Sequence, residues 1–359
     1  MYWDKTQEQE LPGIYLYLNR TVERVIRAGA NGIVAMVATS SVTEAKGKVH
    51  EITKPREIVA ALGTSKQHAE LAMQGGARKL IIYVLGEAET LGDGLDALAP
   101  YYFDVFALGY DAEKADVDAM KSWRASMVQE GRHFVGLAGS TYGQADVAAI
   151  KAIYAAAKDN DLAYVGFGGV DNGGNEYSGG QIAAYLAGVQ GSRGLAEGSL
   201  TRFAVPFLVD VEHRLSKAQR TELKDAGIIA LLHNGQEIVV DQAITSDATG
   251  FAKGKLRIAY NAAVYQETLN FALENEFIGK INNDEAGQAS LLAAVNEFND
   301  RLVDARVLTP GTETKLHPDF ESVGDEVFLM TRGEFIDAVE RIYFEFVAQQ
   351  TQASQGGAA

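Results

Sequence analysis

Cysteine is missing from this chain of 359 residues, and so are long apolar runs. The first absence excludes disulfides and thiolate metal sites, and it fits assembly in a reducing cytoplasm. The second argues against a membrane-spanning helix, which needs about 20 apolar residues. The opening residues, Met1-Tyr2-Trp3-Asp4-Lys5, do not form a signal peptide. With 47% hydrophobic and 22% charged residues, the sequence is typical of a soluble globular protein with two domains.

Basic residues are also scarce, because 32 Lys and Arg stand against 48 Asp and Glu, for a formal net charge of −16. This balance argues against a nucleic-acid partner, whose phosphates would be repelled. The dense positive patch of the chain is Lys253-Gly254-Lys255-Leu256-Arg257. Two interpretations of it stay open: a solvated loop before a strand, or a contact with an acidic protein partner.

A recognisable catalytic constellation is missing as well. The sequence Gly166-Phe167-Gly168-Gly169 follows a predicted strand at 162–165, but a dinucleotide fingerprint needs a third glycine where Asp171 stands. A glycine turn at the end of a parallel strand explains it equally well. The alternative of a soluble α/β enzyme or small-molecule binding protein with a site near Gly166–Gly169 nevertheless stays open.

Other candidate chemistry is no stronger. The polar run 171–176 misses the spacing of a calcium loop. The six histidines are scattered, which leaves only a zinc site assembled from distant positions. Ser140 lacks the glycine–x–serine–x–glycine elbow, and nothing supports a triad of Ser140 with His233 and Asp171. We therefore predict no catalytic residue, cofactor or metal site.

Between about residues 25 and 198, strand-like and helix-like segments alternate, which predicts an α/β domain with a mainly parallel sheet. We expect strands at 32–37, 79–85, 103–108, 134–138 and 162–167, and helices at 55–62, 68–75, 113–129, 145–158 and 181–189.

After Gly198 the alternation loosens. Ser216 is placed to cap a helix, and Asn234-Gly235 predicts a hairpin. We then expect a strand at 256–258, a helix at 263–274, a helix that begins after Asn282 or Asn283 and runs to about 307, and a strand at 323–330. Asn282 or Asn283 would cap the last helix, since Asn282 and Glu285 have capping-box spacing.

Two strand-like runs, at 13–19 and 338–347, have no hairpin partner beside them. In both, side chains alternate with the period of a strand. The residues concerned are Ile14, Tyr15, Leu16, Tyr17 and Leu18 in the first run, and Ile342, Tyr343, Phe344, Phe346 and Val347 in the second. Each run must pair with a distant part of its own chain or with another molecule.

Four motifs resemble those of tail sheath proteins from contractile phages and related injection systems, including R-type bacteriocins. The most specific is Asn275-Glu276-Phe277-Ile278-Gly279-Lys280-Ile281-Asn282-Asn283-Asp284-Glu285-Ala286-Gly287. In the family, a helix, a turn of this kind and a long helix follow one another, with Gly279 ending the first helix and Asn283 or Asp284 capping the next. The others are Pro12-Gly13-Ile14-Tyr15, the run 238–245 and the closing Asp337-Ala338-Val339-Glu340-Arg341-Ile342-Tyr343.

The resemblance implies a fold and a division into domains. We expect an N-terminal arm at 1–24, a subtilisin-like α/β domain at 25–250 without a protease triad, and a C-terminal α+β inner domain at 251–337. A strand arm at 338–350 and a disordered tail at 351–359 follow. Only residues 86–100 separate the strand at 79–85 from the next one, so the chain looks like a compact sheath protein without an inserted outer β-rich domain.

The resemblance also implies a structural, non-enzymatic function. Subunits would form stacked hexameric rings around a tail tube, linked by strand exchange, and contract to drive the tube through a target envelope. Partners would be further copies of the chain, the tail tube protein, and baseplate and tail terminator proteins, with no nucleic acid and no membrane insertion. Assembly would take place in the bacterial host cytoplasm, in a virion tail or a bacteriocin particle. Lys253, Lys255, Arg257 and Lys280 are the residues expected to face the tube.

Overall fold

The computed structural model describes residues 32–250 and 252–346 of the chain. These residues divide into a larger unit, 32–264 with 335–346, and a smaller unit, 265–334. The predicted strand at 13–19 and the predicted tail lie outside the described residues, and so does Val347. The two units are taken one at a time below.

The larger unit is built on one seven-stranded sheet. In spatial order its strands are β10 (Ile228–Ile229), β6 (Leu162–Val165), β5 (Val135–Gly139), β4 (Val105–Leu108), β1 (Ile33–Ala38), β3 (Lys79–Val84) and β2 (Lys48–Ile52). Neighbouring strands are parallel except β2, which runs antiparallel to β3 at the edge. The predicted mixed α/β fold with a mainly parallel sheet is confirmed.

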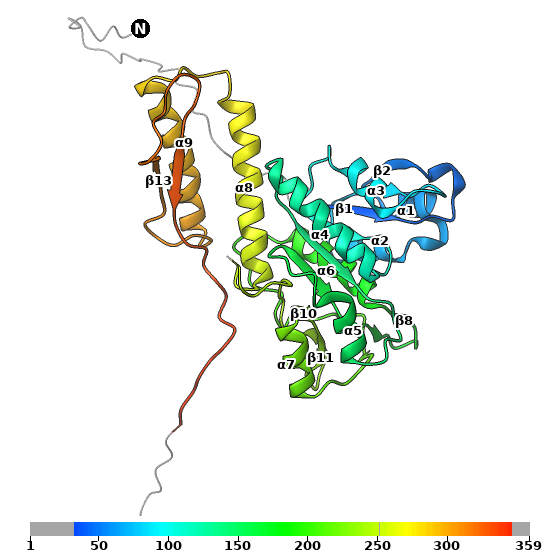
Figure 1. Cartoon of the computed structure of the whole chain (residues 1–359). Coiled ribbons are helices and arrows are strands. Elements are labelled where there is room, and N and C mark those ends of the chain that lie inside the picture. Colours follow the sequence, from blue (N-terminus) through cyan, green and yellow to red (C-terminus); the bar gives the residue numbers. More distant parts are fainter. Residues whose placement is uncertain (1–31, 251, 347–359) are drawn as a thin grey trace, which may run out of the picture. The chain divides into compact units, whose positions relative to one another are not determined.

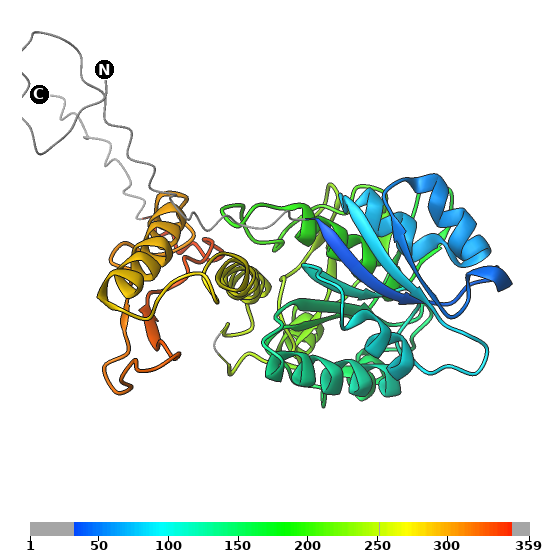
Figure 2. The same cartoon turned by 90° about the horizontal axis from the view of Figure 1, so that it is seen from above.

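Helices cover both faces of this sheet, as the views in Figure 1 and Figure 2 show. One face carries α6 (Gly179–Ser192), with α2 (Gln67–Gln74) and α1 (Pro55–Leu62). The other face carries α3 (Leu91–Leu98), α4 (Lys114–Gln129) and α5 (Val147–Tyr154), followed by α7 (Lys217–Asp225). Because both faces are covered, the strands of the interior are nearly continuous apolar runs.

Helix α6 lies at the centre of the larger unit. All residues from Gly179 to Gly191 are buried, and most of them are apolar, as is typical of a helix enclosed on every side. At Gly188 a side chain would overlap the carbonyl oxygen of Ala72, which shows how closely the backbones of α2 and α6 approach. Glycine is therefore required at this point of the helix.

Short antiparallel pairs complete the larger unit. Strand β7 (Gly169–Val170) pairs with β8 (Glu176–Tyr177) and with β9 (Asp210–Val211). The hairpin predicted around Asn234-Gly235 is confirmed as β11 (Leu231–His233) and β12 (Ile238–Val240). None of the described helices is long and apolar enough to span a membrane.

The smaller unit holds two long helices and a two-stranded sheet. Helix α8 (Leu256–Glu276) belongs to it from residue 265 onward, and α9 (Glu285–Asp304) and the antiparallel strands β13 (Glu313–Leu316) and β14 (Leu329–Arg332) follow. The buried Asn299 joins these elements: its oxygen accepts from the Tyr265 hydroxyl and its amide donates to Thr314 Oγ1, both at 2.9 Å.

Three predictions for the last third of the chain were wrong. Residues 256–258 form the first turn of α8 instead of a strand, and the helix is buried on every side from 256 to 264, so no periodicity marked it in the sequence. Asp284 caps α9 by accepting from Gly287 N at 2.8 Å, so the capping box predicted at Asn282 was wrong, whereas Asp284 is one of the two caps that the resemblance implied. The strand expected at 323–330 lies later, at β14.

Candidate functional site

The glycine turn at 166–169 is already filled by a side chain of the protein. Glu212 accepts hydrogen bonds from the backbone amides of Gly143 (2.7 Å) and Gln144 (3.1 Å) on one oxygen and of Gly168 (2.8 Å) on the other. Its side chain is only 4% exposed. A carboxylate therefore occupies the loop amides that a phosphate group would need. At Gly168 itself, a side chain would overlap the carbonyl oxygen of Tyr177.

The structure does not bring Ser140, His233 and Asp171 together as a relay. The buried Ser140 hydroxyl donates to the carbonyl of Gly166. His233 Nδ1 accepts from Gly235 N within its own hairpin turn. The Asp171 carboxylate accepts from the side chain and backbone of Asn175, which hold its pKa below the ordinary value. Among the residues that the structure describes, no group of three or more His, Asp or Glu is arranged to hold a metal ion.

A polar cluster that the sequence analysis did not single out lies beside the start of α6. Asp111 accepts from the hydroxyl of Ser178 and lies 3.1 Å from His68 Nε2. Ser178 is the N-cap of α6 and accepts from Gln181 N at 3.0 Å. The Asp111 carboxylate lies between the serine and the imidazole, so His68 cannot accept the hydroxyl proton of Ser178 directly as a general base would. The cluster fixes a helix end and does not form a nucleophile; its sequence signal was the capping pair Ser178 and Gln181.

The basic run 253–257 is not one exposed patch. Lys255 Nζ pairs with the Glu340 carboxylate and lies 3.7 Å from Asp337 Oδ2. Arg257 is buried, which lowers its pKa, and it donates to the carbonyls of Glu197 (2.9 Å) and Ile336. Lys253 is exposed. Two of the three residues are thus engaged inside the larger unit.

Lys280 belongs to the smaller unit, at the turn after α8. It donates to the carbonyl of Asn275, near the end of that helix. Gly279 beside it has φ +71, the left-handed conformation expected of a glycine that ends a helix. A contact of Lys253, Lys255, Arg257 and Lys280 with a tube stays a prediction.

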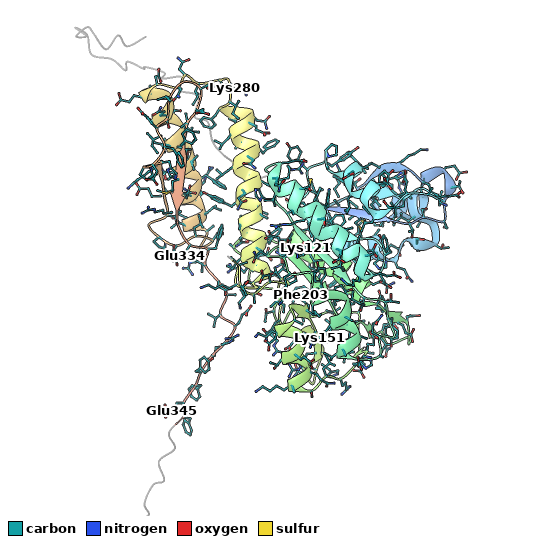
Figure 3. All side chains as sticks on the ribbon, in the orientation of Figure 1. Lys121, Lys151, Phe203, Lys280, Glu334 and Glu345 are labelled. Carbon is teal, nitrogen blue, oxygen red and sulfur yellow. The ribbon has the colours of Figure 1, made fainter. Side chains whose placement is uncertain are left out.

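Five of the eight exposed large apolar residues in the described part of the larger unit lie between Val339 and Phe346. Residues 336–346 form no helix or strand, and Figure 3 labels Glu345 in this segment. Its large apolar side chains and their exposed fractions are Val339 82%, Ile342 84%, Tyr343 90%, Phe344 85% and Phe346 77%. We call 341–346 the arm and 336–340 the arm base. Within the described part of the chain, no strand pairs with the arm.

The sheet of the smaller unit is open. In the described residues, β13 and β14 pair only with each other, so each has a free edge. The loop between them presents Phe320 and Val323, both more than half exposed. An open edge beside exposed apolar side chains is a surface suited to strand addition.

Comparisons with solved structures agree on the fold. The chain superposes on the sheath tail protein from Desulfitobacterium hafniense with a TM-score of 0.69 at 15% identity, over 90% of this chain and 100% of that one. The anti-feeding prophage helical sheath in its contracted state gives 0.71 at 16% identity, over 95% and 100%. The sheath complex of the PVC extracellular contractile injection system, also contracted, gives 0.72 at 11% identity, over 96% and 99%. The chain therefore has the fold of a sheath protein.

The family comparison points the same way. Residues 87–246 match the model of the phage tail sheath protein central domain. The resemblance predicted from the sequence motifs is thereby confirmed. A comparison with curated proteins finds no significant sequence match. The compact form is also seen in the structure, because the segment between β3 and β4 holds the single helix α3 and no inserted domain.

Proposed function

We propose that this chain is the structural subunit of a contractile tail sheath. The observation that carries the proposal is the exposed apolar arm at the end of a chain with a sheath-protein fold. Burial of such side chains is worth about 1.5–3 kcal/mol each, so an arm left in water forgoes a large stabilisation. A partner that covers it recovers this free energy.

The partner that fits best is another copy of the chain. The alternation of the arm suits a β-strand, and an edge strand gains both backbone hydrogen bonds and side-chain burial when it is added to an open sheet. The sheet β13–β14 offers such edges. We propose that the arm of one subunit adds to β13–β14 of a neighbour, with the segment at 13–19 as a second link. An extended strand advances about 3.3 Å per residue, so the arm alone reaches about 20 Å.

Such links would join subunits into stacked hexameric rings around a tail tube. After a trigger from the baseplate, the rings would rearrange to a shorter and wider lattice and drive the tube through the target envelope. The folded units would turn as rigid bodies, while the arms keep the lattice connected. The tail tube, baseplate and tail terminator proteins are the other partners we propose. Assembly would take place in the bacterial cytoplasm. The assembled sheath would then be part of a virion tail or of a bacteriocin particle.

The test is a chain that ends at Glu340, compared with the full chain. We expect the shortened protein to keep its circular dichroism and its melting temperature, because the arm contributes nothing to the folded units. It should form no striated cylinders in electron micrographs under conditions where the full chain forms them. A matched control removes only residues 351–359 and should assemble normally. Cylinders from the chain without its arm would contradict the strand exchange.

A further inference from the structure

The boundary between the arm and its base is sharp, and it coincides with one acidic side chain. Glu340 has a side chain that is 13% exposed, whereas Ile342 and Tyr343, two and three residues later, are 84% and 90% exposed. The chain is therefore held against the larger unit at Glu340, whereas the apolar side chains from Ile342 onward lie in solvent.

Two side chains of the larger unit hold Glu340. One carboxylate oxygen is paired with Lys255 Nζ, and the other accepts from the Thr201 hydroxyl at 2.8 Å. Thr201 is itself fixed, because its oxygen accepts from the backbone amide of Ala243 at 3.0 Å. Lys255 also lies 3.7 Å from Asp337. One lysine thus interacts with both acidic residues of the closing motif.

The backbone of the arm base is held as well. Arg257, buried and two residues after Lys255, donates to the carbonyl of Ile336 and to that of Glu197 in the body of the unit. Two residues of the basic run 253–257 therefore bind the arm base. Lys255 pairs with its carboxylates, and Arg257 donates to its backbone carbonyl at Ile336.

Apolar packing does little to hold this segment. A cavity of about 380 Å³ lies beside Glu340, and residues 198, 199, 201, 202, 241 and 242 line it together with the segment 338–341. Val339 next to Glu340 points into solvent at 82% exposure. Hydrogen bonds from the charged side chains Lys255 and Arg257 are therefore the main attachment.

We propose that Lys255, Thr201 and Glu340 form a clasp that anchors the arm base to the larger unit, so that the movable link between subunits begins at Arg341. This inference rests on the proposed sheath function. The clasp transmits force from the arm to the larger unit, and it fixes the direction in which the arm leaves. Glu340 is a positioning residue, which acts on assembly through the arm that follows it.

Limited trypsin digestion of the monomer tests the clasp directly. Cleavage after Arg341 requires residues 338–340 to detach from the larger unit and to bind in the active-site cleft of trypsin. The variant Lys255→Gln leaves the arm sequence unchanged, and we expect it to be cut there about tenfold faster, the ratio that corresponds to about 1.4 kcal/mol. The matched control is Lys253→Gln, an exposed lysine two residues away, which should be cut at the wild-type rate. Equal rates for the two variants would overturn the clasp.

Assembly provides the second readout. Lys255→Gln and Glu340→Gln should each form shorter cylinders than the wild type, and the double variant should be no worse than either single one, since the two side chains act as a pair. Glu345→Gln, in the exposed arm, is the control. Additive defects in the double variant would contradict the pairing. If the wild type forms no cylinders at all, the sheath function fails, while the digestion result still decides the clasp.

Discussion

Helix α6 and the arm are both rich in apolar side chains, yet their surroundings are opposite. Every residue from Gly179 to Gly191 is buried among the helices and strands of the larger unit. The arm residues Ile342, Tyr343 and Phe344 are at least 84% exposed. The first segment has its partners within the chain and supports the fold of the monomer. The second has none among the described residues, and this exposure is the observation on which the proposed strand exchange rests.

The largest effect should come from a substitution in the buried segment, at the point where the backbone of α6 comes closest to that of α2. In most helices Gly→Ala stabilises by up to about 1 kcal/mol. At Gly188 the new methyl group would overlap the carbonyl of Ala72, so we expect Gly188→Ala to destabilise by about 3 kcal/mol. Thermal unfolding measures this loss. Gly198→Ala, where no atom lies within 4 Å, is the control and should leave the melting temperature within about 2 °C. An unchanged melting temperature for Gly188→Ala would show that α2 and α6 are not packed this closely.

The second prediction disturbs the exposed segment. Phe344→Asp removes an apolar side chain that is 85% exposed in the single chain, so the stability of the monomer should change by less than about 0.5 kcal/mol. Assembly should be lost, because a charge would enter the interior of the neighbouring subunit. Sedimentation and electron microscopy measure it. Glu345→Gln, which alters the opposite face of the strand, should assemble normally. Equal defects in both variants would mean that the arm does not bind as a strand with one buried face.

The third prediction concerns Glu340, where the buried and exposed segments meet. Burial alone would raise the pKa of the Glu340 carboxyl, but the hydrogen bonds from Lys255 and Thr201 outweigh it and hold the pKa below the ordinary value of 4.5. A pKa lowered by folding means that the clasp contributes fully above pH 4.5 and is lost as the pH falls through the folded value.

The chain has no cysteine, so a fluorophore on Tyr343→Cys reports on the arm alone. At pH 7 its anisotropy should be higher in the wild-type background than in Lys255→Gln. The difference should vanish as the pH falls below 4.5, while circular dichroism confirms that the fold persists. A difference that is independent of pH would exclude the carboxylate as the anchor.

Local signals explain which parts of the fold were predictable. Helix α1 was predicted with its observed bounds because Pro55 begins it and Gly63, at φ +58, ends it. Strands β1 and β3 are apolar throughout because they are buried on both faces. Strand β13, with its alternating polar residues Glu313 and Lys315, was missed because only Thr314 within it faces the core.

The candidate site depended on contacts between distant residues, which no local pattern contains. Lys255 and Glu340 are 85 positions apart, and Glu212 lies 44 positions after Gly168. The basic run 253–257 therefore resembled a surface patch, although Lys255 within it pairs with the acidic residues of the closing motif. The run predicted as a strand at 338–347 is neither helix nor strand over its described residues 338–346, so its pairing with another molecule stays a prediction.

The smallest effect that we predict concerns the start of α9. This helix end is exposed, whereas the start of α6 is buried. Asp284 caps α9 through a single hydrogen bond to Gly287 N, and Asp284→Ala should cost about 1 kcal/mol. Asn282→Ala should cost almost nothing, because Asn282 is exposed and is not the cap, despite its capping-box spacing. Chemical denaturation of the two variants measures the difference. Ser178→Ala at the start of α6 should cost more than either, since it also deprives the Asp111 carboxylate of a donor. If the exposed cap proved the more costly, burial would not be what separates the two helices.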